Sequence, residues 1–244
     1  MDARSTSTQI VTADMLAHLP EPARRYLTHA GIIGKPWINT ARLQYTGRFR
    51  TGRDKPWMGI AATQVYTTNP PGFRWNARFS LFGLPLLTGQ DTYKDGHGHM
   101  FGRLARLFTI FDARGDEMDQ GTMVRYLNEM IWFPTAFLSD YITWGAVSEH
   151  AVDVTFHDAG RSVTARLYVD DNGRLLNFVA PRYAENQGTF TMHDWATPIT
   201  EYGTLGGLSL PVHGKAVWYM PEGDLAYADL TMRHLEYNQP IETF

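Results

Sequence analysis

The sequence predicts a mainly β protein (α+β), in which one strongly curved antiparallel sheet forms a half-barrel or open barrel. A central helix lies on its concave side, and further helices lie at the N-terminus. Apolar and polar residues alternate with a period of two in many short segments, and turn residues separate these segments. Helical and strand segments do not alternate, which disfavours a parallel sheet. One amphipathic segment near residues 120–133 interrupts the strand pattern.

The composition indicates one folded domain. A chain of 244 residues exceeds the commonest domain size, but β sandwiches and barrels often reach this length as one unit. Its hydrophobic fraction of 43% allows a sizeable core, which disfavours disorder. We therefore expect a flexible N-terminus over residues 1–11 and a single half-barrel domain over residues 12–244.

Charge and targeting signals exclude several classes of protein. The formal net charge is -3, and Lys and Arg form no basic stripe, so we expect no nucleic-acid partner. The chain has no cysteine, which excludes disulfides and thiolate chemistry. The N-terminal residues lack the apolar core of a signal peptide, and no run approaches the roughly 18 apolar residues of a membrane span. We expect a cytoplasmic protein without a membrane span.

Two short helices are expected first. One begins after Thr12 and runs through Leu19, and Pro22 suits the first turn of a second helix that ends at Gly31. From Thr40 onward the period changes to two. Strands are predicted around residues 40–49, 58–62 and 73–79, and Asp95-Gly96 marks a hairpin. The stretch 99–111 suits one strand or two, although its LARLF segment also suits a helical turn.

The strand pattern returns after the amphipathic segment. Alternating residues predict strands around 152–156, 163–169 and 176–180, with a turn at Asp171-Asn172-Gly173 between the last two. Further strands are expected near 188–195, 198–203, 208–220 and 225–237. In total, these periodic patterns predict about ten strands and three helical segments.

The central helix is predicted to begin with Asp119 as its N-cap and to run to Phe133, where Pro134 ends it. At about 100° per residue, its residues divide between two faces. One face is apolar and carries Met123, Leu127, Met130 and Ile131; the other carries Arg125, Asn128, Glu129 and Trp132.

The polar face of this helix has two interpretations. Arg125 and Glu129 can form a solvent-exposed pair four residues apart, which contributes a few tenths of a kcal/mol. Alternatively, the face lines a cavity beneath the sheet, where Arg125 fixes Glu129, Asn128 supplies an amide and Trp132 forms an apolar wall. Asn and Trp have only moderate helix propensity, which favours a specific role for them.

Four segments carry a resemblance to a known family. They are LPEPARRYL (19–27), KPWMGIAATQVYTTNPPGFRW (55–75), EMDQGTMVRYLNEMIWFPTAFL (117–138) and WATPITEYGTLGGLSLPVHGKAVWY (195–219). Together they resemble a bacterial family of uncharacterised function, over nearly the whole chain, which implies a shared architecture and no reaction. VTARLYVDDNGRLLNF followed by YGTLGGLSLP is also similar to the half-barrel of lipoprotein carriers and of a related pigment-biosynthesis enzyme. Such half-barrels hold apolar ligands under helices; the missing signal peptide departs from the carriers.

Metal and cofactor chemistry find little support in the sequence. His97 and His99 point the same way on a strand near Asp95, but no third ligand has a recognisable spacing, so no metal site is predicted. No phosphate loop, dinucleotide fingerprint or nucleophile elbow occurs, so no cofactor is expected. His193, His213 and His234 are candidate general bases.

Three functions remain compatible with these residues. The first is a protein that binds a small, largely apolar molecule with a polar group. The second is a cofactor-free lyase, isomerase, cyclase or hydrolase with Glu129 as general acid or base. The third is a structural or partner-binding protein. The candidate catalytic residues are Glu129, Arg125, Asp119 and His193; the candidate ligand-binding residues are Asn128, Trp132, Tyr126, Trp75, Tyr183, Trp195, Tyr202 and Trp218.

Overall fold

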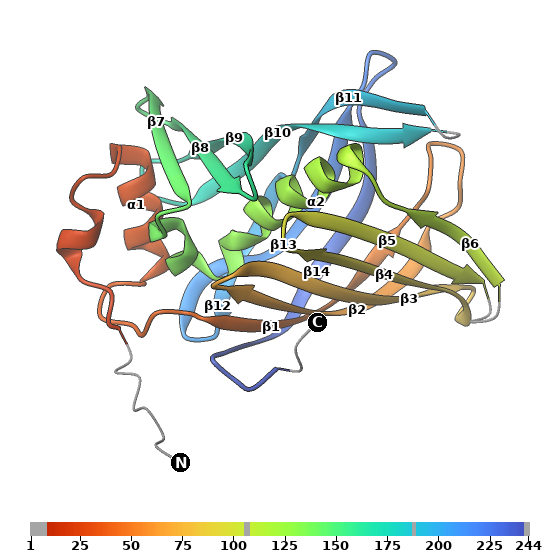
Figure 1. The fold of residues 1–244 in the computed structure, drawn as a ribbon, viewed down its shortest axis with the longest axis horizontal. Coiled ribbons are helices and arrows are strands. Elements are labelled where there is room, and N and C mark those ends of the chain that lie inside the picture. Colours follow the sequence, from red (N-terminus) through yellow and green to blue (C-terminus); the bar gives the residue numbers. More distant parts are fainter. Residues whose placement is uncertain (1–8, 105–107, 187–188, 242–244) are drawn as a thin grey trace.

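A single antiparallel sheet dominates the protein, as a computed structural model shows; the structure describes residues 9–104, 108–186 and 189–241. The sheet has 14 strands in the order β6-β5-β4-β3-β2-β1-β14-β13-β11-β10-β9-β8-β7, with β12 paired to β13. It curls into a half-barrel, and helix α2 lies between its two arms (Figure 1). The predicted fold class is therefore confirmed.

The N-terminal segment closes one end of the half-barrel. A 3-10 turn η1 (Ala13–Leu16) precedes α1 (Glu21–Ala30), which has Pro22 in its first turn and ends at Gly31 with a positive φ of 79°. Helix α1 packs on β8, β9 and β13 at the left of Figure 1. Within residues 1–11, where a flexible N-terminus is expected, Val11 is buried and its N–H donates to Lys35 O. Residues 1–8 lie outside the described residues.

The first arm of the sheet contains β1 (Thr40–Phe49), β2 (Met58–Thr68), β3 (Pro71–Leu81), β4 (Leu84–Lys94), β5 (His97–Leu104) and β6 (Phe108–Ala113). The turn at Asp95-Gly96 is confirmed, because both residues have positive φ, as a two-residue hairpin requires. The 99–111 stretch belongs to two paired strands. Residues 105–107, the centre of the LARLF segment, lie outside the described residues.

The second arm contains β7 (Ile142–Ser148), β8 (Ala151–Asp158), β9 (Arg161–Val169), β10 (Leu175–Asn186) and β11 (Thr189–Ala196). Next come β12 (Ile199–Leu205), β13 (Leu208–Tyr219) and β14 (Leu225–Tyr237), and β14 pairs with β1 to join the arms. Strand β7 has no predicted counterpart. It is an edge strand whose last four residues are exposed, so it lacks the alternation of apolar and polar residues that identifies its neighbours.

Helix α2 (Asp116–Glu129) is followed by the 3-10 turns η2 (Met130–Trp132) and η3 (Pro134–Leu138). The predicted N-cap is wrong, because Gly115 occupies that position and Asp119 lies inside the first turn. The helix also ends four residues before Phe133. It contacts β4 and β5 on one side and β9 and β10 on the other. No helix among the described residues is long and apolar enough to cross a membrane.

Candidate functional site

A buried network of charged and amide groups connects α2 to the first arm of the sheet. The guanidinium of Arg125 donates from Nε to Glu129 Oε1 (3.0 Å), from Nη1 to Asp91 Oδ2 (2.7 Å) and from Nη2 to Gln64 Oε1 (3.0 Å). Gln64 Nε2 in turn donates to Glu129 Oε2 at 2.5 Å. Both Glu129 oxygens and three nitrogens of Arg125 are thus held by named partners.

Aromatic rings and burial fix the position of Arg125 further. Its guanidinium lies over the rings of Phe73 and Trp75, 5.1 and 4.8 Å from their centroids. The side chains of Arg125, Glu129 and Asp91 are only 12%, 9% and 2% exposed. The interpretation of Arg125 and Glu129 as a solvated surface pair is therefore wrong.

Burial sets the protonation behaviour of this network. Desolvation raises the pKa of Asp91, and the positive charges of Arg125 and Arg182 oppose that shift. Desolvation likewise raises the pKa of Glu129, against the charge and hydrogen bonds of Arg125 and Gln64. For Arg125 desolvation acts to lower the pKa, but Glu129 and Asp91 outweigh it, so its pKa is raised and it stays a cation.

These raised carboxyl pKa values predict a specific dependence of stability on pH. A group with a raised pKa binds its proton more tightly in the folded state, so its contribution to the free energy of unfolding falls as pH rises. For Asp91 the fall begins near the ordinary carboxyl pKa of about 4. Urea unfolding of the wild type and of Asp91→Asn, compared from pH 4 upward, should show the free energy of unfolding of the wild type falling relative to that of the variant as pH rises through the raised pKa of Asp91. A constant difference between the two proteins would contradict the raised pKa of Asp91.

A cavity of about 170 Å³ lies beside this network. Its apolar wall combines aromatic and aliphatic side chains, and its polar wall consists of charged, amide and hydroxyl groups. The aromatic residues are Tyr45, Phe49, Trp75, Trp132, Trp195 and Tyr227; the main polar ones are Asp91, Arg125, Asn128, Glu129, Arg182 and Thr197. For scale, an engineered cavity of about 150 Å³ in another protein holds benzene.

Hydrogen bonds hold the three indoles of the cavity wall. Trp75 Nε1 donates to the Tyr45 hydroxyl (2.6 Å) and Trp195 Nε1 donates to the Tyr227 hydroxyl (2.9 Å). Trp132 Nε1 donates to the backbone oxygen of Pro211 at 3.1 Å. A wall of anchored aromatic side chains is pre-formed, so little side-chain entropy is lost when a ligand enters.

The structure brings half of the sequence-predicted site residues together. Six line the cavity: Glu129, Arg125, Asn128, Trp132, Trp75 and Trp195. Asn128 Nδ2 donates to Thr197 Oγ1 at 2.7 Å, which connects α2 to the loop before β12. The other six are Asp119, His193, Tyr126, Tyr183, Tyr202 and Trp218, and none of these lines the cavity.

Asp119 and Tyr126 have structural partners away from the cavity. Asp119 accepts hydrogen bonds from the Gly98 N–H and from Arg161, and it contacts His97. It therefore attaches the first turn of α2 to β5 and β9. Tyr126 is buried against Phe156, and its hydroxyl donates to Thr67 O.

The remaining four lie on the sheet outside the cavity. The Tyr202 hydroxyl accepts a hydrogen bond from the Leu175 N–H and donates one to Leu175 O. His193 is paired across the strands with Arg182, and Arg182 rather than Tyr183 reaches the cavity. Trp218 does not line the cavity, but its ring stacks on the ring of Tyr227, which does. Of the other candidate bases, His213 lines the cavity but is paired with Asp229, and His234 is paired with Glu236.

Two members of the network have no counterpart among the predicted site residues. In β2, Gln64 continues the alternate positions of Met58, Ile60 and Ala62, whose side chains are buried. A polar residue at a position where the alternation predicts an apolar one was the signal that could have identified it. Asp91 shares its phase in β4 with the buried Tyr93. Ile131 also lines the cavity, although the helical pattern placed it on the apolar face, away from Arg125 and Glu129. The helix changes to a 3-10 turn at Met130, and this rotates Ile131 toward the cavity.

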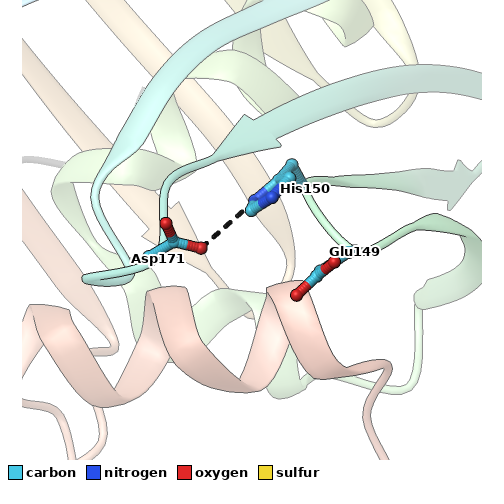
Figure 2. Close-up of side chains that lie close together, drawn as sticks. All are labelled: Glu149, His150 and Asp171. Atoms are coloured by element: carbon cyan, nitrogen blue, oxygen red, sulfur yellow. Dashed lines mark ion pairs between the residues drawn. The ribbon is translucent and has the colours of Figure 1, made fainter.

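The histidine clusters do not form a buried metal centre. His97 contacts Asp119 and His99 contacts Asp112, so these two histidines have different carboxylate partners. Among the described residues, Glu149, His150 and Asp171 also come close together near α1 (Figure 2). All three are exposed, and His150 already pairs with Asp171 at 3.7 Å, so the group fits a surface ion pair.

Comparison with known proteins addresses ancestry and fold. The profile of a family of unknown function, DUF6544, matches residues 9–230. No protein of curated function matches the sequence. A DUF1329 family protein from Desulfovibrio piger has a similar structure, with a TM-score of 0.50, 8% identity and 96% of each chain covered.

Two further solved structures show weaker similarity. A LolA superfamily protein from Nitrosomonas europaea has a TM-score of 0.49 and 8% identity, over 95% of this chain and 96% of that one. A putative outer membrane lipoprotein-sorting protein domain from Vibrio parahaemolyticus has a TM-score of 0.43 and 8% identity, over 84% and 87%.

Proposed function

The chain belongs to the DUF6544 family of unknown function, and we propose that it binds a small, largely apolar molecule that carries one polar group. The ligand occupies the cavity between the curved sheet and α2. Its apolar part contacts the aromatic wall, and its polar group meets the end formed by Asp91, Arg125 and Glu129.

The observation that carries this proposal is the charged network at the wall of an aromatic cavity. Burying two carboxylates and a guanidinium costs free energy of folding that apolar residues at the same positions would not cost. Binding sites for small molecules are typically apolar hollows with a few fixed polar groups that orient the ligand. The combination of Asp91, Arg125 and Glu129 with anchored indoles has this composition.

Binding is favoured over acid–base catalysis by Glu129. Its two oxygens accept hydrogen bonds from Arg125 and Gln64, and taking a proton from a ligand would remove the negative charge that strengthens both bonds. A role as a solvated partner-binding surface is disfavoured because the face with Arg125, Asn128 and Glu129 is buried. The site is therefore suited to holding a molecule by means of fixed dipoles and charges.

The proposal is tested with a substitution that fills the cavity. Ala216 lines the cavity, and Ala61 lies exposed on the other face of the sheet. We expect native mass spectrometry of the purified wild type and of Ala61→Leu to reveal the same bound small molecule. Ala216→Leu should lose it while keeping a cooperative thermal transition, because the added carbons occupy the ligand's space. Equal retention of the molecule by Ala216→Leu would place the ligand elsewhere and overturn the proposal.

A further inference from the structure

The network leaves one buried hydrogen-bond acceptor without a partner. Asp91 Oδ2 accepts from Arg125, and the Thr92 N–H also acts on the carboxyl, but among the described residues Asp91 Oδ1 has no partner at hydrogen-bond geometry, although the side chain is only 2% exposed. Buried carboxylate oxygens are normally paired, and an unpaired one is costly. Asp91 lines the cavity, so a donor on a bound molecule can satisfy this oxygen.

The neighbouring charges select the kind of donor. Arg125 already pairs with Asp91 and Glu129, and three of its nitrogens are engaged, so it offers little to a ligand carboxylate. An anionic group would also meet the two carboxylates. An ammonium group would lie near two guanidinium groups, because Arg182 lines the same cavity. A neutral donor avoids both repulsions and is less costly to desolvate than an ion.

A hydroxyl fits the remaining groups of the cavity best. The Tyr45 and Tyr227 hydroxyls accept hydrogen bonds from Trp75 and Trp195, and each keeps its own hydrogen to donate. An alcohol or phenol can donate to Asp91 and accept from such a tyrosine, whereas an aldehyde or ketone can only accept. The cavity thus offers an acceptor for the hydrogen of a ligand hydroxyl and a donor for its oxygen.

We infer that the ligand presents a neutral hydroxyl group that donates a hydrogen bond to Asp91 Oδ1. This inference rests on the proposed function, because it assigns a ligand class to the same cavity. The ligand is then an alcohol or phenol with an apolar ring or chain, rather than a carboxylic acid or an amine.

Four probes of similar size test the inference: benzyl alcohol, benzaldehyde, benzoate and toluene. Their binding is followed at pH 8 by titration of the indole N–H resonances of Trp75, Trp132 and Trp195, which line the cavity. We expect benzyl alcohol to bind at least about tenfold more tightly than benzaldehyde, because only the alcohol satisfies the buried acceptor. Benzoate should not bind, and toluene should report on the apolar wall alone.

Asp91→Asn supplies the matched variant. The asparagine can still accept from Arg125 through its oxygen, and it then presents an N–H₂ donor where the wild type has Oδ1. The preference for benzyl alcohol over benzaldehyde should disappear or reverse in this variant, while toluene binding stays within about twofold, given that no apolar contact changes. The ranking of the four probes on the wild type decides the matter by itself if the variant does not fold.

The outcomes separate the two proposals. Toluene binding with equal affinities for benzyl alcohol and benzaldehyde would overturn the hydroxyl assignment and leave the binding function standing. Tightest binding by benzoate would also overturn the assignment, in favour of an anionic ligand. If no indole resonance shifts with any of the four probes, the cavity is not a binding site for them, and this result would count against the proposed function.

Discussion

Arg125→Met is expected to lower the free energy of unfolding by about 3–5 kcal/mol, the cost of removing one partner from a buried ion pair. The substitution keeps the apolar length of the side chain over Phe73 and Trp75. It leaves Asp91 and Glu129 buried without their cation, and Gln64 without a donor to its oxygen. Urea unfolding measures the change.

A matched arginine provides the control for this experiment. Arg166 makes two hydrogen bonds to Asp153, but the two side chains are 44% and 31% exposed, so solvent screens the pair and Arg166→Met should have a far smaller effect. The triple variant Arg125→Met, Asp91→Asn, Glu129→Gln should recover much of the lost stability, because it removes the stranded charges as well. Equal losses for Arg125→Met and Arg166→Met would contradict a buried, mutually dependent network.

Gly98→Val is expected to cost roughly 3 kcal/mol, at the upper end of what overpacking a core costs. Gly98 lies in β5 beneath the first turns of α2. A Cβ at this position would lie 2.7 Å from the backbone oxygen of Met118 and would also clash with the Thr122 side chain. Since backbone cannot turn aside like a flexible side chain, the helix must move away from the sheet.

The design of this second test separates packing from strand propensity. Valine favours strands, so any loss must come from the close approach of α2 to β5. In the control Gly145→Val, on β7, the nearest atom to an added Cβ is 3.7 Å away, so thermal unfolding should change little. Because α2 carries Arg125 and Glu129, Gly98→Val should also weaken toluene binding. Unchanged stability of Gly98→Val would contradict the close packing of α2.

The secondary structure was largely predictable from local patterns. The β1–β3 strands, the hairpins at Asp95-Gly96 and Asp171-Asn172-Gly173, and the start and end of α1 all follow from alternation, turn residues and capping preferences. Edge strand β7 has no such pattern because most of its residues are exposed. The capping preference of Asp led to the wrong N-cap for α2, because Asp119 accepts a hydrogen bond from the Gly98 N–H in β5 instead of capping the helix.

The candidate site was predictable only on the side that one helix supplies. Helical periodicity alone placed Arg125, Asn128, Glu129 and Trp132 on one face, and all four line the cavity. Their partners lie elsewhere in the chain: Asp91 is 34 residues from Arg125 and Gln64 is 61 residues from it. No local pattern relates residues so far apart.

The sequence by itself thus determined the class of fold, most strands and the polar face of the central helix, because each depends on residues within one or two turns or strands. Only the tertiary structure decided that this face is buried and that Asp91 and Gln64 meet Arg125. It also decided that one oxygen of Asp91, beside the cavity, has no hydrogen-bond partner in the described part of the chain. The physical reason is strand pairing: the curl and register of the sheet bring β2 and β4 under α2, and those depend on the whole set of strands together.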